Sequence, residues 1–136
     1  MPEQTVKKII LAVDDMPMNL ALIRNILCKD YDVRPVKSAK TALLLMNTIR
    51  PDLILLDIEM PEMSGLEFFN LIRDNPDRPD QKDIPVIFIS SHGTESVVSQ
   101  AMDGGARGYV VKPLNPAVLL EKIASLLNAD KLSGQD

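Results

Sequence analysis

Polar side chains that could carry chemistry follow four hydrophobic runs in this sequence. Two adjacent acids come after the first run, and a third acid, a hydroxyl and an amine close the later ones; they are Asp14, Asp15, Asp57, Ser90 and Lys112. Each has an ordinary explanation when taken singly, because an Asp after a strand usually forms a turn or caps a helix. The joint pattern of acid pair, acid, hydroxyl and amine is specific, and it indicates a functional site.

Three such acids at one edge of a sheet would repel one another strongly. Two carboxylates about 5 Å apart interact unfavourably by on the order of 3 kcal/mol at an effective dielectric constant near 20. One carboxyl must therefore keep a proton, or the group must bind a cation. Oxygen ligands without a neighbouring His or Cys select a hard cation, so the sequence favours Mg²⁺ over Zn²⁺.

The same residue types suit phosphoryl transfer to an aspartate. If Asp57 is the nucleophile, the reaction needs alignment, a metal and positive charge near the equatorial phosphoryl oxygens. Asp14 and Asp15 would hold the metal. Lys112 would supply the charge and Ser90 a hydroxyl donor. The turn after the first run contains no glycine and matches no phosphate-cradling loop, so a phosphate there would need a cation.

Buried strands alternate with amphipathic helices along the chain. Nearly continuous apolar runs at residues 8–13, 53–56 and 86–89 are typical of strands covered on both faces. Helical stripes separate and follow them: Leu20-Ile23-Leu27, Ala42-Leu45-Met46-Ile49 and Leu120-Ile123-Leu127. A weaker strand, Asp32–Val36, contains Pro35 and is therefore expected at a sheet edge. Right-handed crossovers favour an α/β fold, a doubly wound parallel sheet of five strands flanked by five helices.

Local signals mark helix ends. Asn115 followed by Pro116 predicts the start of a last helix, which we expect to end near Leu127. Ser64 and Glu67 have the spacing of a capping box, so another helix should begin there.

Two further segments are defined by composition. The pair Gly104-Gly105 predicts the end of a helix that begins near Ser96, because glycine adopts the left-handed conformation found at helix C-termini. Residues 74–83 are polar and contain two prolines, which predicts a loop.

Length and charge exclude several classes of protein. The chain has 136 residues, with 15 Lys+Arg against 19 Asp+Glu and a net charge of −4. We expect one domain at residues 1–128 and a polar C-terminal tail at 129–136. The acidic balance argues against direct nucleic-acid binding. One Cys rules out an internal disulfide framework, and no apolar run nears the roughly 20 residues of a membrane span, so we expect a cytoplasmic protein.

These residues and their neighbours resemble the CheY-like response-regulator receiver domains of bacterial two-component signalling. The resemblance covers about residues 7–128, and its motifs are Val13-Asp14-Asp15, Asn19-Leu20, Leu55-Leu56-Asp57-Ile58-Glu59-Met60-Pro61, Ser64-Gly65, Ser90 and Tyr109-Val110-Val111-Lys112-Pro113. It implies a flavodoxin-like fold with strand order 2-1-3-4-5, in which the strand containing Pro35 is an edge strand.

The resemblance also implies roles for the site residues. Asp57 would be the phosphoacceptor, supplied by a sensor histidine kinase or phosphotransfer protein, and Ser90 and Lys112 would contact the phosphoryl group. Mg²⁺ would be held by three carboxylates and one backbone carbonyl, those of Asp14, Asp15, Asp57 and Glu59. The Lys112-Pro113 bond is expected to be cis.

A conformational switch is a further implication of the resemblance. Ser90 would move toward the phosphoryl group and Tyr109 would turn into the vacated space. That movement would change the face formed by the fourth helix, fifth strand and fifth helix, which would signal to a downstream output protein or output domain. Glu59 and His92 occupy positions at which the family varies and tunes dephosphorylation.

Two rival functions fit these residues less well. A Mg²⁺-dependent phosphohydrolase working through an aspartyl phosphate is the alternative, but haloacid-dehalogenase-like enzymes usually carry Asp where this chain has Glu59, and we expect no cap domain. A flavin-binding electron carrier is disfavoured by the acidic first loop. We therefore predict catalysis confined to the domain's own phosphorylation and dephosphorylation.

Other conspicuous residues have simpler interpretations. His92 is the only histidine, so it cannot complete a transition-metal site or a Ser-His-Asp triad, and a loop histidine is expected. Cys28, near the end of the first helix, is interpreted as a small, partly buried thiol. Val118 and Leu119 broaden the apolar face of the last helix, which favours packing on the sheet over a partner or homodimer surface.

Overall fold

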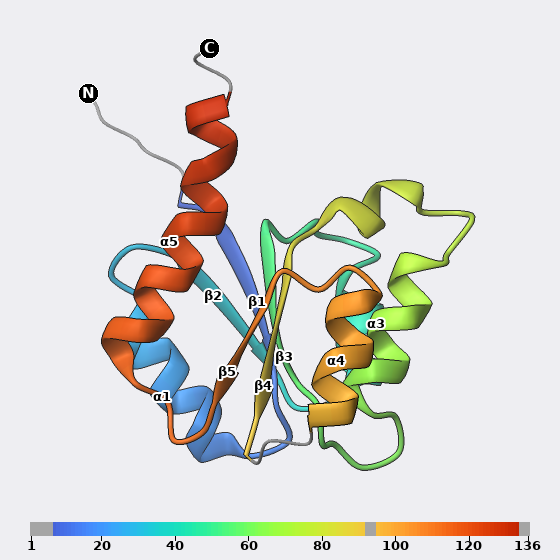
Figure 1. The fold of residues 1–136 in the computed structure, drawn as a ribbon, viewed down its shortest axis with the longest axis horizontal. Coiled ribbons are helices and arrows are strands. Elements are labelled where there is room, and N and C mark those ends of the chain that lie inside the picture. Colours follow the sequence, from blue (N-terminus) through green and yellow to red (C-terminus); the bar gives the residue numbers. More distant parts are fainter. Residues whose placement is uncertain (1–6, 92–94, 134–136) are drawn as a thin grey trace.

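The computed structural model describes residues 7–91 and 95–133. Within them, five strands alternate with five α-helices (Figure 1): β1 Ile9–Val13, α1 Pro17–Leu27, β2 Asp32–Val36, α2 Ala39–Leu45, β3 Leu53–Asp57, α3 Gly65–Arg73, β4 Val86–Ser90, α4 Glu95–Asp103, β5 Gly108–Val111 and α5 Pro116–Ser133. In this part of the chain, no helix is both long enough and apolar enough to cross a membrane.

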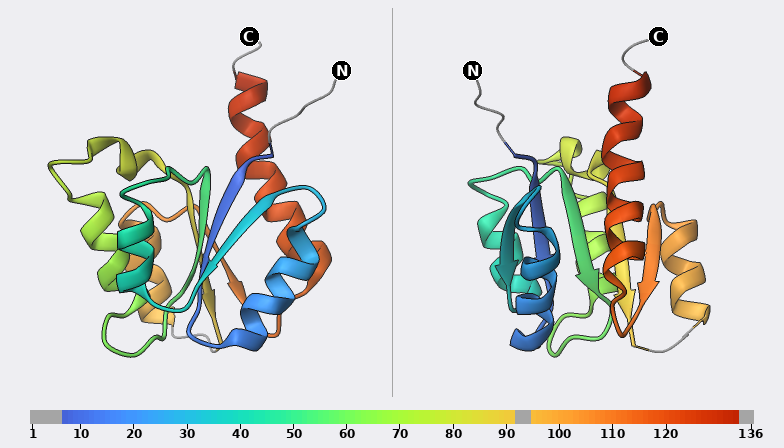
Figure 2. Two further views of the ribbon diagram at one scale, coloured as in Figure 1. Left: turned by 180° about the vertical axis from the view of Figure 1, so that it is seen from behind. Right: turned by 90° about the vertical axis from the view of Figure 1, so that its left-hand side faces the viewer.

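The strands form one parallel sheet in the order β2-β1-β3-β4-β5. Helices α1 and α5 cover one face, and α2, α3 and α4 cover the other (Figures 1 and 2). The predicted doubly wound fold and strand order are confirmed. β2 is an edge strand, in which Pro35 lies in register with Ala12 of β1. An edge position accommodates proline because the missing N–H can face away from the sheet.

The three central strands, β1, β3 and β4, pack alternate side chains into two separate core layers. In β1, Ile10 and Ala12 belong to the cluster under α1 and α5, whereas Leu11 and Val13 belong to the cluster under α2, α3 and α4. These four side chains are buried. Burial on both faces explains why the strand sequences are continuously apolar instead of alternating.

The predicted helix starts are present. The Ser64 hydroxyl accepts a hydrogen bond from the Glu67 N–H at 3.2 Å, and the Glu67 carboxylate accepts one from the Ser64 N–H at 2.9 Å. The Asn115 side-chain oxygen accepts the Val118 N–H at 3.2 Å at the start of α5. These contacts satisfy backbone donors that have no partner inside the helix.

Glycine ends α4 as predicted. Gly105 has a φ of 114°, in the left-handed region. The Ala106 N–H then donates to the Ala101 carbonyl at 3.0 Å. This bond closes the last turn of the helix and directs the chain toward β5.

Three boundaries differ from the sequence expectation. α2 ends at Leu45, so Met46 and Ile49 of its predicted stripe lie beyond the helix. α5 continues past Leu127, the predicted end, to Ser133, so the predicted polar tail begins as helix. The predicted loop at residues 74–83 contains a 3₁₀ helix, η1, at Pro79–Asp83, in which Gln81 is buried. Most residues of the segment 74–83 are exposed, as their polar composition predicts. α5 is longer than predicted because a helix can continue past the apolar residues that pack it against the sheet.

Burial also differs at two helix positions. The core stripe of α5 is Leu119, Ile123 and Leu127, and Leu120 lies at its flank, only partly buried. Cys28 is exposed, not partly buried, because it is the C-cap residue that follows Leu27, the last buried residue of α1. Adjacent helical residues are about 100° apart around the axis, so a shift of one residue exchanges a core position for a surface position.

Candidate metal centre at the carboxyl edge of the sheet

The three predicted acids meet at the carboxyl edge of the sheet. Asp14, Asp15 and Asp57 each offer one carboxylate oxygen, and these oxygens all lie within 4.8 Å of one another. Val13 of β1 is in register with Leu56 of β3, so the residues that follow them are neighbours. Asp14 and Asp57 are buried and Asp15 is half-buried, which confines strong negative charge to a small volume.

Lys112 reaches the same carboxylates from β5. Its Nζ lies 3.4 Å from Oδ2 of Asp57 and 3.4 Å from Oδ2 of Asp14. The Lys112 N–H donates to the Ser90 carbonyl at 2.7 Å, which fixes the backbone beside β4. The Lys112-Pro113 peptide bond is cis, as expected.

Ser90 is buried at the end of β4, in register with Val111 of β5 and one residue after Ile89, the partner of Asp57. It therefore lies at the same edge as the acids. Tyr109 lies on β5 with 43% of its surface exposed, so its ring is accessible to solvent in this structure.

Asp14 has one satisfied oxygen and one unsatisfied oxygen. Oδ1 accepts the Met16 N–H at 2.9 Å and the Asn19 side-chain amide at 3.4 Å. Oδ2 is buried without a hydrogen bond from the residues that the structure describes, although the Lys112 ammonium lies nearby. Lys112 supplies one positive charge for the two carboxylates of Asp14 and Asp57, so a bound cation would compensate the remaining negative charge of the three acids. The donor set, three carboxylates without His or Cys, fits Mg²⁺.

The pKa of Asp57 is raised from 3.8 to about 6, first because the carboxyl group is buried and second because the negative charge of Asp14 is nearby. The Lys112 ammonium and the Glu59 N–H, which donates to Asp57 Oδ1 at 3.3 Å, act in the opposite direction. Above pH 6 the carboxylate is mainly ionised, as a nucleophile requires. A bound cation would further favour the ionised form of Asp57.

Two contacts at the site were not predicted from the sequence. Gly65 lies so close to β3 that a Cβ atom there would overlap the Asp57 carbonyl oxygen, and its N–H donates to the Ile58 carbonyl at 2.9 Å. The Ser91 hydroxyl donates to the Glu59 carboxylate at 2.9 Å across the mouth of the site. The contact of Gly65 could have been suspected from the sequence, because a glycine directly follows the N-cap residue Ser64. No feature of the sequence indicates the hydrogen bond from Ser91 to Glu59.

His92, the other residue expected to tune dephosphorylation, lies outside the described residues.

A parallel sheet in this strand order, with acids, a serine and a lysine at its carboxyl edge, defines the CheY-like class of signalling domain. The chain belongs to the response regulator receiver domain family, whose model matches residues 10–124.

This chain resembles one relative of similar length and one that is much longer. The polar-differentiation response regulator DivK of Brucella anthropi is 31% identical over 121 residues, which cover 88% of this chain and 96% of DivK. A probable cyclic di-GMP phosphodiesterase of Vibrio cholerae is 38% identical over 114 residues, or 84% of this chain. The chain spans only 25% of the length of that protein.

Solved structures share the fold closely. The chemotaxis protein CheY4 of Vibrio cholerae has a TM-score of 0.79 and 28% identity, covering 86% of this chain and 96% of CheY4. A CheY-like receiver domain protein of Methanospirillum hungatei has a TM-score of 0.82 and 27% identity, covering 93% and 98% of the two chains.

Proposed function

We propose that Asp57 accepts a phosphoryl group from a phosphohistidine of a sensor histidine kinase or phosphotransfer protein. A carboxylate oxygen of Asp57 forms the new bond to phosphorus, and the bond from phosphorus to the histidine nitrogen breaks, with its electron pair returning to the imidazole. The observation that carries this proposal is the meeting of Asp57 with Asp14, Asp15 and Lys112 at one edge of the sheet. Membership of the receiver family supports it.

The metal of this reaction would be Mg²⁺, held by the carboxylates of Asp14, Asp15 and Asp57 and the backbone carbonyl of Glu59. When bound, it would neutralise the carboxylates and the phosphoryl oxygens. The gathering of three carboxylates beside one lysine, with Oδ2 of Asp14 buried and accepting no hydrogen bond from the described residues, supports this assignment.

Lys112 and Ser90 would hold the transferred group. The Lys112 ammonium, which contacts the carboxylates, can bond a phosphoryl oxygen after transfer, because a lysine is a mobile point charge with three donors. The Ser90 hydroxyl would donate to another oxygen.

Phosphorylation would be communicated to the output partner by a local conformational change. We propose that Ser90 moves toward the phosphoryl group and that Tyr109, exposed on β5, turns into the vacated space. This would alter the face formed by α4, β5 and α5, where an output protein or output domain would bind. The domain would act in the cytoplasm with its kinase.

We propose no catalysis beyond the domain's own phosphorylation and dephosphorylation. The Vibrio cholerae relative is named as a phosphodiesterase, but this chain spans only 25% of its length. We therefore do not propose phosphodiesterase activity for this chain.

Site mapping tests the proposal. After incubation with a small phosphodonor and Mg²⁺, borohydride reduction should convert the modified aspartate to homoserine, and peptide mass spectrometry should find it at Asp57. Homoserine at Asp14 or Asp15 would contradict the assignment of the phosphoacceptor. Rapid turnover of a model phosphate ester would favour a phosphohydrolase instead.

A further inference from the structure

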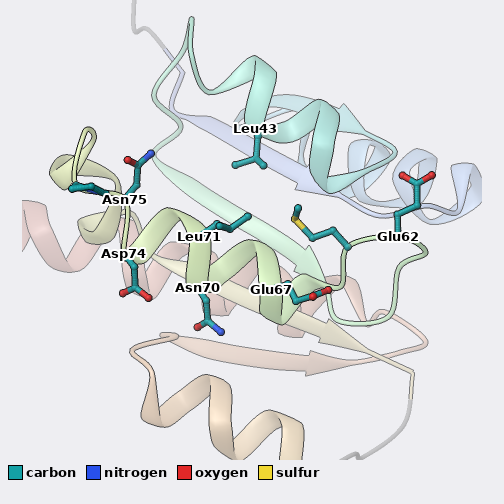
Figure 3. Close-up of a pocket in the computed structure, with 9 residues that line it drawn as sticks. Leu43, Glu62, Glu67, Asn70, Leu71, Asp74 and Asn75 are labelled. Atoms are coloured by element: carbon teal, nitrogen blue, oxygen red, sulfur yellow. The ribbon is translucent and has the colours of Figure 1, made fainter.

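A groove between α2 and α3 lies outside the cluster of site acids. Its volume is about 750 Å³, and it is lined by Leu43 of α2, Leu71 of α3 and Met63 of the loop that joins β3 to α3. Figure 3 shows Leu43 pointing from α2 toward α3 and Leu71 rising from α3 on the opposite side. Two helices thus form the walls of an open channel.

The floor of the groove is apolar and accessible. Leu71 is 48% exposed, and Leu43 and Met63 are partly buried against the core below them. Leu44, the next residue on α2, lines an adjoining hollow and is 63% exposed. Exposed leucines gathered around a hollow are a feature of binding surfaces, since covering them removes apolar area from water.

The charge of the groove has one sign. Among its described lining residues, every charged side chain is acidic: Glu62, Glu67 and Asp74. Asp74 is paired with Arg73 at 3.2 Å, and one oxygen of Glu67 accepts the Ser64 N–H at 2.9 Å. Glu62 is an exposed residue with a φ of 70°, a conformation uncommon for residues other than glycine, on the loop five residues after Asp57.

Basic side chains line the hollow on the other side of Leu43. This adjoining hollow is lined by Lys40 and Arg78, and Arg78 is engaged with Asp80 and with the Met46 carbonyl. A ligand that extended across both hollows would therefore meet acidic side chains at α3 and basic side chains beyond α2.

We propose that the groove binds a basic amphipathic helix of a partner protein. Apolar side chains of that helix would contact Leu43 and Leu71, and its Lys or Arg side chains would lie beside Glu62 and Glu67. A channel between two helices suits a helix laid into a groove. Charge complementarity favours a cationic partner over an acidic one, and the chain's net charge of −4 adds to that preference.

The proposal does not depend on phosphorylation, so it can fail or succeed separately from the function of Asp57. The probe is a designed helical peptide of about 18 residues, with leucine on one face and lysine on the other. A matched peptide carries glutamate in place of lysine. Both are titrated into the full ¹⁵N-labelled chain and followed by amide chemical shifts.

The lysine peptide should shift amides of α2, α3 and the loop between β3 and α3, and the glutamate peptide should not bind. Leu71→Ser and Glu62→Lys should each weaken binding by at least about fivefold. Val118→Ser, a change at a 39% exposed residue of α5, is the control and should leave affinity unchanged. Glu62 lies on an exposed loop, so its variant keeps the test valid if the Leu71 variant folds poorly.

Three results would overturn the proposal. The first is a set of shifts on α1 or on the face of α4, β5 and α5 in place of the groove. The second is equal binding of the glutamate peptide, or affinity unchanged in both groove variants. The third is a dimer of the free chain that Leu71→Ser abolishes, which would assign the groove to a second copy.

Discussion

The Lys112 ammonium lies 3.4 Å from Asp57 Oδ2 and also 3.4 Å from Asp14 Oδ2, so one cation bridges two buried carboxylates. It lies beside the carboxylates that are expected to bind Mg²⁺. Lysine and metal therefore compete electrostatically in the unphosphorylated protein.

Replacing this lysine should strengthen Mg²⁺ binding. Lys112→Ala removes a repelling charge a few ångströms from the metal, and we expect affinity at pH 8 to rise about tenfold, whereas Lys112→Arg should stay near wild type. Calorimetric titration with Mg²⁺ measures both. An alanine variant that binds Mg²⁺ no more tightly than wild type would show that the ammonium does not oppose the metal.

Stability without metal should fall as the pH rises through the titration of Asp57. Its pKa is about 6 in the folded protein against 3.8 for the ordinary group, so the folded state holds the proton more tightly than the unfolded chain. The free energy of unfolding should therefore decrease between about pH 4 and pH 6 and stay low above that range, by at most about 3 kcal/mol.

Asp57→Asn removes this titration and provides the comparison. In EDTA at pH 8, urea denaturation should find the variant more stable than wild type, by at most about 3 kcal/mol, with a flatter pH profile. Mg²⁺ should narrow the difference by stabilising wild type preferentially. A less stable variant under these conditions would contradict the raised pKa.

Much of the fold could be predicted because its signals are local. Continuous apolar strands, the Ser64 cap and Gly105 each act within a few residues, and all are present in the structure. The meeting of Asp14 with Asp57 followed from topology, since parallel strands end at one edge.

Other features depend on tertiary packing, which cannot be predicted from the pattern of residues in one sequence. Leu119 and Leu120 are equally apolar, and only the angle at which α5 meets the sheet selects Leu119 for the core. The contact of Gly65 with the Asp57 carbonyl and the bond from Ser91 to Glu59 join segments whose approach is set by tertiary structure.

The close approach of α3 to β3 should make Gly65 irreplaceable. A methyl group there would overlap the Asp57 carbonyl oxygen, and we expect Gly65→Ala to cost at least about 2 kcal/mol in urea denaturation. Gly108 is the matched control, because a Cβ atom there meets nothing within 4 Å, and Gly108→Ala should change stability by less than about 0.5 kcal/mol. Equal effects of the two changes would refute the tight contact.

Glu59 lies two residues after Asp57 in the sequence, and its carboxylate accepts a hydrogen bond from the Ser91 hydroxyl at 2.9 Å. We expect it to accept a hydrogen bond from the water that attacks the phosphoryl group. Glu59→Ala should therefore lengthen the lifetime of the phosphorylated protein by at least about threefold. Ser91→Ala should act in the same direction, and the double variant should show less than the combined effect. Decay is followed by phosphate release, with Glu62→Ala as the control. A decay rate unchanged in Glu59→Ala would remove this role.

Phosphorylation at Asp57 is tested most directly by intact-mass measurement after incubation with a small phosphodonor, with and without Mg²⁺, for wild type and Asp57→Asn. One added phosphoryl group, labile and present only in wild type with Mg²⁺, is the expected result. Equal labelling of the Asp57→Asn protein, or labelling of wild type that is indifferent to Mg²⁺, would contradict the assignment of Asp57 as a metal-dependent phosphoacceptor.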